Sequence, residues 1–151
     1  MSDFAAVRSG LYSILTNVTG LSAGNVFKYA PNNAAMEPFA FISRGSGDIS
    51  GGDGNPWLYS GFRETTHHPT VTVCFSLQSG IGDAEAQSDA FVDRIVDAIG
   101  LHQTLNGNVA SASVVSYETA EVTLRAGDPT FYGLRFQLWI QEIESGTLTG
   151  A

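Results

Sequence analysis

Residues 131–143 read Phe-Tyr-Gly-Leu-Arg-Phe-Gln-Leu-Trp-Ile-Gln-Glu-Ile, and this stretch decides the fold class of the chain. In an extended segment, one face would carry the apolar side chains, at Tyr132, Leu134, Phe136, Leu138 and Ile140. The other face would carry Arg135, Gln137, Trp139 and Gln141. Because successive side chains of a strand point to opposite faces, the alternation predicts a strand with one face on a core.

A second alternating stretch, residues 70–77, leads into an amphipathic helix. It places valine, phenylalanine and leucine on one face, and threonine, cysteine and serine on the other. Beyond Gly80-Ile81-Gly82-Asp83, apolar residues recur at helical spacing, which predicts a helix over 83–99 that Gly100 ends. The expected buried face of this helix consists of Ala84, Phe91, Ile95, Ala98 and Ile99.

The remaining segments complete a one-domain α+β protein over residues 1–151. The patterns predict a first helix over 3–18, strands over 25–30 and 39–44, and a long glycine-rich loop over 45–61. Residues 109–124 are β-rich and form one bulged strand or two shorter ones, 125–130 form a turn, and 145–151 form a flexible tail. This order predicts a mainly antiparallel sheet with two amphipathic helices packed on one face.

Composition and charge exclude several classes of protein. The formal net charge is −8, and Lys28 is the single lysine, so no basic cluster is present that could hold nucleic-acid phosphates. Cys74 is the only cysteine, which excludes an internal disulfide and a cysteine-based zinc site. We expect no secretion signal and no membrane-spanning segment. Charged residues make up 15% of the chain, against about 25% in typical soluble domains, as is common in assemblies.

Motifs for catalysis or for cofactor binding are not found in the sequence. The adjacent His67 and His68 would point to opposite faces of a strand and would not chelate one metal, and His102 stands apart. No nucleophile elbow or phosphate-binding glycine loop occurs, and Cys74 fits an ordinary strand position. Residues 51–55 match a calcium-binding turn only in a single unrepeated copy. We therefore expect no enzyme activity, cofactor or metal.

Two groups of residues remain as candidate sites. An acidic ridge follows the predicted second helix at i, i+4 spacing: Glu85, Asp89, Asp93 and Asp97. A solvated helix face is the favoured explanation of this ridge, and a functional surface is the alternative. Aromatic and apolar side chains form a candidate interface at Trp57, Leu58, Tyr59 and Trp139. A second core layer beneath the long loop is an equal alternative for these residues.

The chain resembles the tail terminator, or tail-completion, proteins of long-tailed bacteriophages. The resemblance spans nearly the whole chain and rests on three stretches: the helix from Asp3 to Val18, the strand 70–77 with the helix that follows it, and the closing strand 132–142 after Asp128-Pro129. It consists in the order of elements, without a short fingerprint motif.

The resemblance implies a structural role in the virion. Such proteins look like hexameric rings that cap the tail tube, end its polymerisation and join the tail to the head connector. The expected partners are further copies of the chain, the major tail tube protein and the connector protein, with genomic DNA passing through unbound. The expected location is the phage tail or neck, after assembly in the host cytoplasm. A neck adaptor, and a small hydrolase or ligand-binding domain, remain as alternatives.

Overall fold

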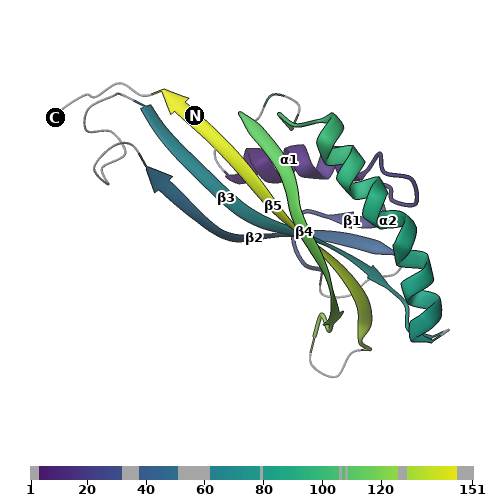
Figure 1. The fold of residues 1–151 in the computed structure, drawn as a ribbon. Coiled ribbons are helices and arrows are strands. Elements are labelled where there is room, and N and C mark those ends of the chain that lie inside the picture. The colour runs from purple at the N-terminus through teal and green to yellow at the C-terminus, as the bar shows by residue number, and fades with distance from the viewer. Residues whose placement is uncertain are drawn as a thin grey trace.

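The computed structural model of the protein describes residues 4–31, 38–50, 62–78, 80–105, 107, 109–125 and 129–145, with side chains described at all of these except 49–50, 62–63 and 143–145. Along the chain, one helix is followed by three strands, a second helix and two strands (Figure 1). The structure is therefore an α+β fold, and this confirms the fold class expected from the alternating and helical patterns.

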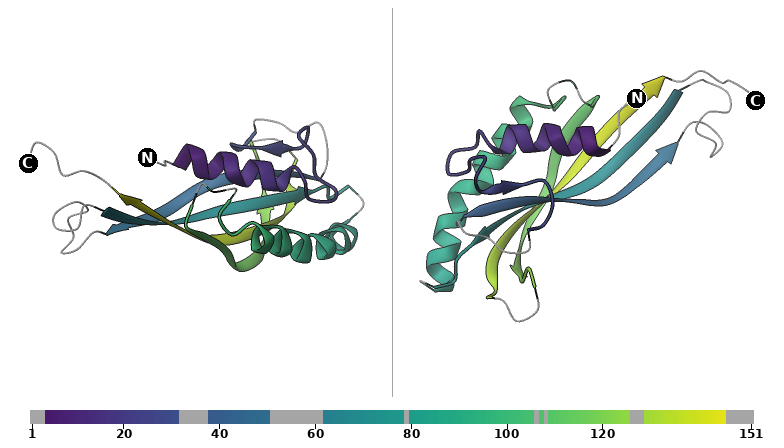
Figure 2. Two further views of the ribbon diagram at one scale, coloured as in Figure 1. Left: turned by 90° about the horizontal axis from the view of Figure 1, so that it is seen from above. Right: turned by 180° about the vertical axis from the view of Figure 1, so that it is seen from behind.

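The five strands form one sheet in the order β1-β2-β3-β5-β4. Its members are β1 (Val26–Phe27), β2 (Phe39–Ser50), β3 (Phe62–Phe75), β4 (Ser111–Val122) and β5 (Phe131–Ser145). The short β1 runs parallel to β2, and the other three pairings are antiparallel. Figure 2 shows that the sheet is strongly twisted and that β2, β3 and β5 project beyond both helices as an arm.

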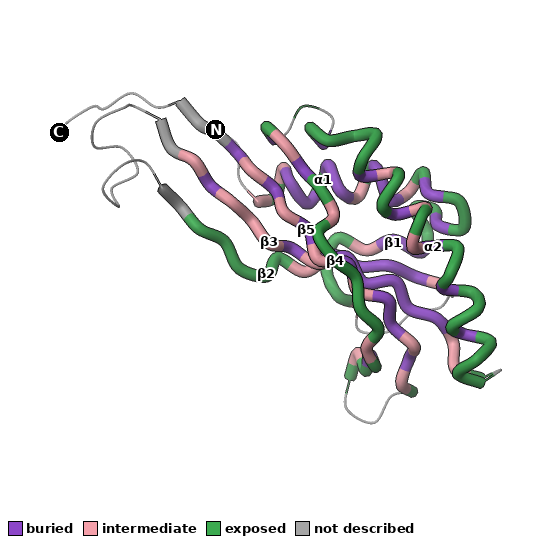
Figure 3. Tube along the Cα trace, viewed as in Figure 1, coloured by how far each residue is buried: buried purple, intermediate pink, exposed green. Residues whose placement is uncertain are grey.

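The helices α1 (Phe4–Leu15) and α2 (Ile81–Leu101) bury their apolar stripes in one core with the sheet. From α1 this core includes Val7, Leu11, Ile14 and Leu15, and from α2 it includes Ala84, Phe91, Ile95 and Ile99. The alternate residues of β5 that the sequence placed on its apolar face, from Leu134 to Ile140, lie beneath them. Burial is therefore concentrated where the helices cover the sheet, and β2 is exposed along the arm (Figure 3).

A smaller apolar cluster lies on the opposite face of the sheet. It consists of Phe39, Phe41, Cys74, Val122 and Phe131, with Phe27 and Leu124 packed against it. The rings of Phe39 and Phe131 meet edge to face, with centroids 5.1 Å apart. Cys74 is fully buried here, which agrees with its expected role as an ordinary strand residue.

The structure corrects the predicted extent of β2 and β3. Strand β2 continues to Ser50, so residues 45–50 belong to the sheet and not to the predicted loop, and residues 51–61 lie outside the described part. Two glycines serve the strand pairing. Gly45 adopts φ of 67° where the register between β2 and β3 shifts, and a Cβ at Gly47 would lie 2.9 Å from the Thr66 carbonyl oxygen. Strand β3 starts at Phe62, well before the predicted residue 70.

Smaller differences occur at other element ends. Helix α1 ends at Leu15, and the predicted strand 25–30 is reduced to Val26–Phe27. Helix α2 is longer at both ends than predicted. The β-rich stretch 109–124 is a single strand whose register shifts between Val114 and Ser116, so the bulged-strand alternative is confirmed. Of the predicted tail, residues 145–151, everything beyond residue 145 lies outside the described part of the chain.

A substitution at Gly133 tests how tightly the smaller apolar cluster is packed. An added Cβ would lie 2.6 Å from Val122 Cγ2 and 2.9 Å from the Ala120 carbonyl oxygen. We expect Gly133→Ala to lower the free energy of unfolding by about 1–3 kcal/mol, because an overfilled site forces its neighbours to shift. The control is Gly100→Ala in α2, where an added Cβ meets nothing within 4 Å; it should gain up to about 1 kcal/mol from helix propensity. Urea denaturation measures both changes, and equal midpoints would contradict the prediction.

Candidate functional site

Among the described residues, no strand covers either edge of the sheet along most of its length. Strand β1 pairs with β2 only at Ala40 and Phe41, so in the described part of the chain no strand lies outside β2 between Ser43 and Ser50. Strand β4 forms the opposite edge. An open edge presents unpaired backbone N–H and C=O groups, which can pair with a strand of another molecule. The two edges are therefore the candidate interaction surfaces of this fold.

The side chain of Arg8, on α1, binds the backbone of β2 at the point where the pairing of β2 with β1 stops. Its guanidinium donates hydrogen bonds to the carbonyl oxygens of Lys28 and Ile42, the second at 2.8 Å. Ile42 lies one residue beyond the last β2 position that pairs with β1, so the Arg8 side chain supplies the next hydrogen bond to β2 after backbone pairing stops. The guanidinium carbon also lies 4.2 Å from the centroid of the Tyr29 ring. Arg8 is buried, and these contacts provide hydrogen-bond acceptors for its charged guanidinium group.

The residues around Arg8 make this edge basic. Burial lowers the pKa of Arg8, the nearby Tyr29 opposes that shift, and the positive charge of Arg44 adds to it. Lys28 lies over the Tyr12 ring of α1, with Nζ 5.3 Å from the ring centroid. Lys28 and Arg44 are exposed, and Tyr29 is 65% exposed. We call Lys28, Tyr29 and Arg44 the basic edge.

The opposite edge combines acidic and apolar side chains. On β4, Val115 is 64% exposed and Tyr117 is 55% exposed, and Val115 occupies the register shift. Glu118 and Glu121 are also exposed, and Glu118 lies 3.7 Å from Arg135 of β5. We call Val115, Tyr117, Glu118 and Glu121 the acidic edge. Natural edge strands usually avoid exposed large apolar side chains, so this pair marks β4 as a candidate interaction surface.

The predicted acidic ridge lies next to this edge on α2. Glu85, Asp89, Asp93 and Asp97 are all exposed, on the side of the helix away from the core. Arg94, the only cation in α2, turns away from the ridge: its guanidinium donates to the Thr19 carbonyl oxygen at 3.1 Å. The structure therefore brings the four ridge residues together, as their spacing predicted.

The predicted aromatic interface is only partly described. Trp139 is half-buried on the sheet face away from the helices, in register with Ser113 of β4. Its neighbours along β5 on that face are Gln137 and Gln141, as expected from the alternation. Trp57, Leu58 and Tyr59 lie outside the described residues, so their grouping with Trp139 stays a prediction.

The two adjacent histidines do point to opposite faces. His67 faces the helices, where its Nε2 lies 3.0 Å from Oε2 of Glu142 and its ring meets Phe4 edge to face. The side chains of His67 and Glu142 are 15% and 4% exposed. On the other face, His68 Nε2 lies 3.5 Å from the Asp48 carboxylate. Sequence reasoning missed Glu142, although its place two residues after Ile140, on the apolar face of β5, was the available signal.

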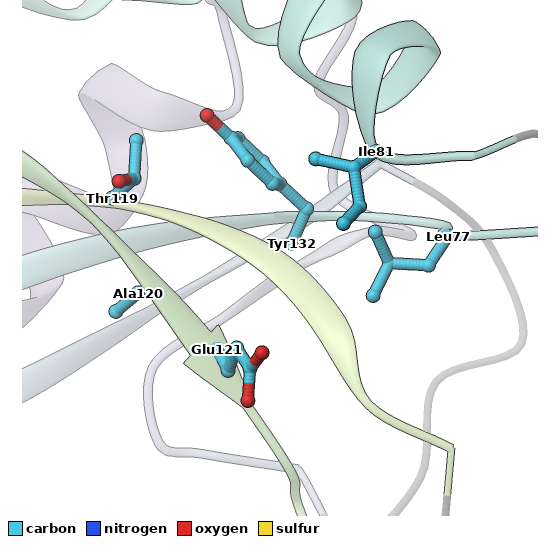
Figure 4. A pocket seen from close by; sticks show the side chains of 6 residues that line it. All are labelled: Leu77, Ile81, Thr119, Ala120, Glu121 and Tyr132. Atoms are coloured by element: carbon cyan, nitrogen blue, oxygen red, sulfur yellow. The ribbon is translucent and has the colours of Figure 1, made fainter.

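A pocket of about 240 Å³ lies between the start of α2 and the strands β4 and β5. Leu77, Ile81 and Tyr132 line it from one side and Thr119 and Glu121 from the other (Figure 4). The lining is mainly apolar, with one carboxylate from the acidic edge. Within the described ranges, no three side chains of His, Cys, Asp or Glu are grouped so that they could hold a metal ion.

Comparison with models of known protein families and with curated proteins found no match for this chain. A search of the described helices found none whose length and apolar character would let it cross a lipid bilayer.

Reversing the ridge tests whether it contributes to the fold of a single chain. We expect Asp89→Lys with Asp93→Lys to change the free energy of unfolding by less than about 0.5 kcal/mol, because exposed charges on a helix contribute little. Thermal unfolding followed by circular dichroism measures this change. A loss several times larger would show that the ridge packs against another part of the chain.

The His67–Glu142 pair is expected to stabilise the arm beneath α1. We expect His67→Phe to cost about 1–3 kcal/mol, because it keeps a ring against Phe4 and removes the nitrogen that faces a buried carboxylate. A double-mutant cycle with Glu142→Gln, measured by urea denaturation, should give a coupling energy of about 0.5–3 kcal/mol. Strictly additive effects would mean that the two side chains do not interact.

Proposed function

We propose that this protein is a structural component of a bacteriophage virion, a tail terminator that self-assembles into a hexameric ring. The ring caps the tail tube, ends its polymerisation and joins the tail to the head connector. In this role the protein acts through its shape and its contacts with partners, and it catalyses no reaction.

The observation that carries the proposal is a sheet whose two edges differ and are left open by the described strands, within the element order on which the resemblance to tail terminators rests. A closed ring needs heterologous contacts, in which one patch of a subunit binds a different patch of the next. A sheet whose two edges differ supplies such a pair of patches. The arm of β2, β3 and β5 adds a long projection that can reach a neighbouring subunit or the tube (Figure 2).

The charge of the chain agrees with the passage of DNA through such a ring. The net charge of −8 and the exposed ridge on α2 would repel phosphate groups. DNA could then move past the ring without binding to it. We assign the ridge to the lumen or to the rim of the ring.

The proposal predicts rings in solution and an effect on tail tubes. Mass photometry and negative-stain electron microscopy of the purified full-length chain should show hexameric rings. Added to the polymerising major tail tube protein of the same genome, the rings should bind tube ends and shorten the tubes measured by microscopy. A protein that stays monomeric at high concentration and leaves tube length unchanged contradicts the proposal. Binding to the connector alone would identify a neck adaptor.

The residues Trp57 and Tyr59 provide a second test of the same assembly. We expect Trp57→Ala with Tyr59→Ala to weaken ring formation while leaving the melting temperature nearly unchanged, because interface aromatics contribute to binding more than to folding of the subunit. A matched control is Leu101→Ala, which shortens an 81% exposed apolar side chain at the end of α2. A large fall in melting temperature for the aromatic variant would instead place both rings in the core.

A further inference from the structure

The two open edges of the sheet carry opposite charges. One end of the sheet consists of β1 and β2, with α1 and residues 28–31 beside them. The charged residues of these segments are three cations, Arg8, Lys28 and Arg44, and one anion, Asp48. The other end consists of β4 with α2 beside it. These two elements contain one cation, Arg94, and seven carboxylates: Asp83, Glu85, Asp89, Asp93, Asp97, Glu118 and Glu121. One end of the strand order is therefore positive and the other strongly negative, although the chain as a whole is acidic.

Lys28 and Tyr29 of the basic edge and Tyr117 and Glu121 of the acidic edge lie on the same side of the sheet. Lys28 and Tyr29 contact side chains of α1, which covers the helix face. On β4, Tyr117 is in register with Phe136 and Glu121 with Tyr132, so both occupy that same face. Glu118 is in register with Arg135 and occupies the other face. When one sheet continues into the next with its helix face on the same side, Lys28 and Tyr29 of one copy meet Tyr117 and Glu121 of the next, and Glu118 lies at the same junction on the other face.

We propose that the basic edge of one copy binds the acidic edge of the next copy, so that β4 of one subunit adds to the open part of β2 in its neighbour. This inference rests on the proposed ring and names the contact that builds it. The partner is a second copy of this chain because the complement of each edge is present on the same molecule. The contact is heterologous, since a basic edge always binds an acidic edge and never a second basic edge.

Backbone and side chains have different tasks in this contact. Main-chain hydrogen bonds between β4 and the segment Ser43–Ser50 supply the general affinity of strand addition. Tyr29, Val115 and Tyr117 lose solvent exposure at the junction, which adds apolar burial. The charges select the pairing, because two basic edges or two acidic edges would bring like charges together. The self-repulsion expected between copies of charge −8 is thereby overcome locally.

Two charge-reversed variants test the proposal. The first, Glu118→Lys with Glu121→Lys, makes both edges basic, and the second, Lys28→Glu with Arg44→Glu, makes both edges acidic. Each variant alone should lose self-association by about tenfold or more, because every contact now joins like charges. An equimolar mixture should recover rings, because each basic edge then finds an acidic one. Mass photometry of size-tagged variants should show the two in equal numbers.

Asp89→Lys with Asp93→Lys is the matched control, since it changes the net charge as much as the first variant does and leaves both edges intact. It should weaken self-association by a much smaller factor than the first variant does, because its residues lie on α2 and not on the strand that pairs. Circular dichroism must show that each variant is folded. Should a reversal prevent folding, Glu118→Gln with Glu121→Gln replaces it and should weaken association by a smaller factor.

The outcomes separate this inference from the proposed function. If the wild type forms rings and either edge variant alone does so equally well, the edge contact is wrong and the ring function stands. If neither variant assembles and the mixture also fails to do so, the pairing of the two edges is likewise overturned. If the wild type never self-associates at any concentration, the proposed function fails first, and the inference falls with it.

Discussion

Burial of the apolar face of β5 is the interaction on which the rest of the structure depends. This strand pairs with β3 on one side and with β4 on the other, and its residues from Leu134 to Ile140 lie beneath both helices. Four large apolar side chains buried in this way contribute on the order of 10 kcal/mol, which is comparable to the net stability of a typical domain. A register slip of one residue would expose all four, so the alternation also sets the register of the neighbouring strands.

The edges of the sheet follow from where pairing stops. Arg8 reaches from α1 to the Ile42 carbonyl oxygen just beyond the short β1, and β2 then continues without an outer neighbour among the described residues. At the other end, β4 presents exposed Val115 and Tyr117 beside two carboxylates. The same features that complete the monomer therefore leave two unlike surfaces, and a head-to-tail assembly requires such a pair.

The candidate site was predictable to the extent that it depends on local periodicity. The ridge from Glu85 to Asp97 follows from helical spacing alone, and the position of Trp139 on the polar face of β5 follows from alternation. The basic edge could not be predicted in this way, because Arg8 and Arg44 come together only through the packing of α1 on the sheet edge. The partner of His67 was hidden for the same reason, since Glu142 is distant in sequence.

The sequence by itself determined the fold class, the buried faces of both helices, the apolar faces of β5 and of β3 from Val71 onward, and the negative charge of the chain, because each depends on composition or on a short repeat. Only the tertiary structure decided the strand order, the extension of β2 and β3 into an arm, and the identity of the open edges. These features arise from pairing between distant segments, such as Ser46 with His68. A glycine-rich stretch has the same local pattern in a loop as in a bulged strand, and only its pairing partner distinguishes the two.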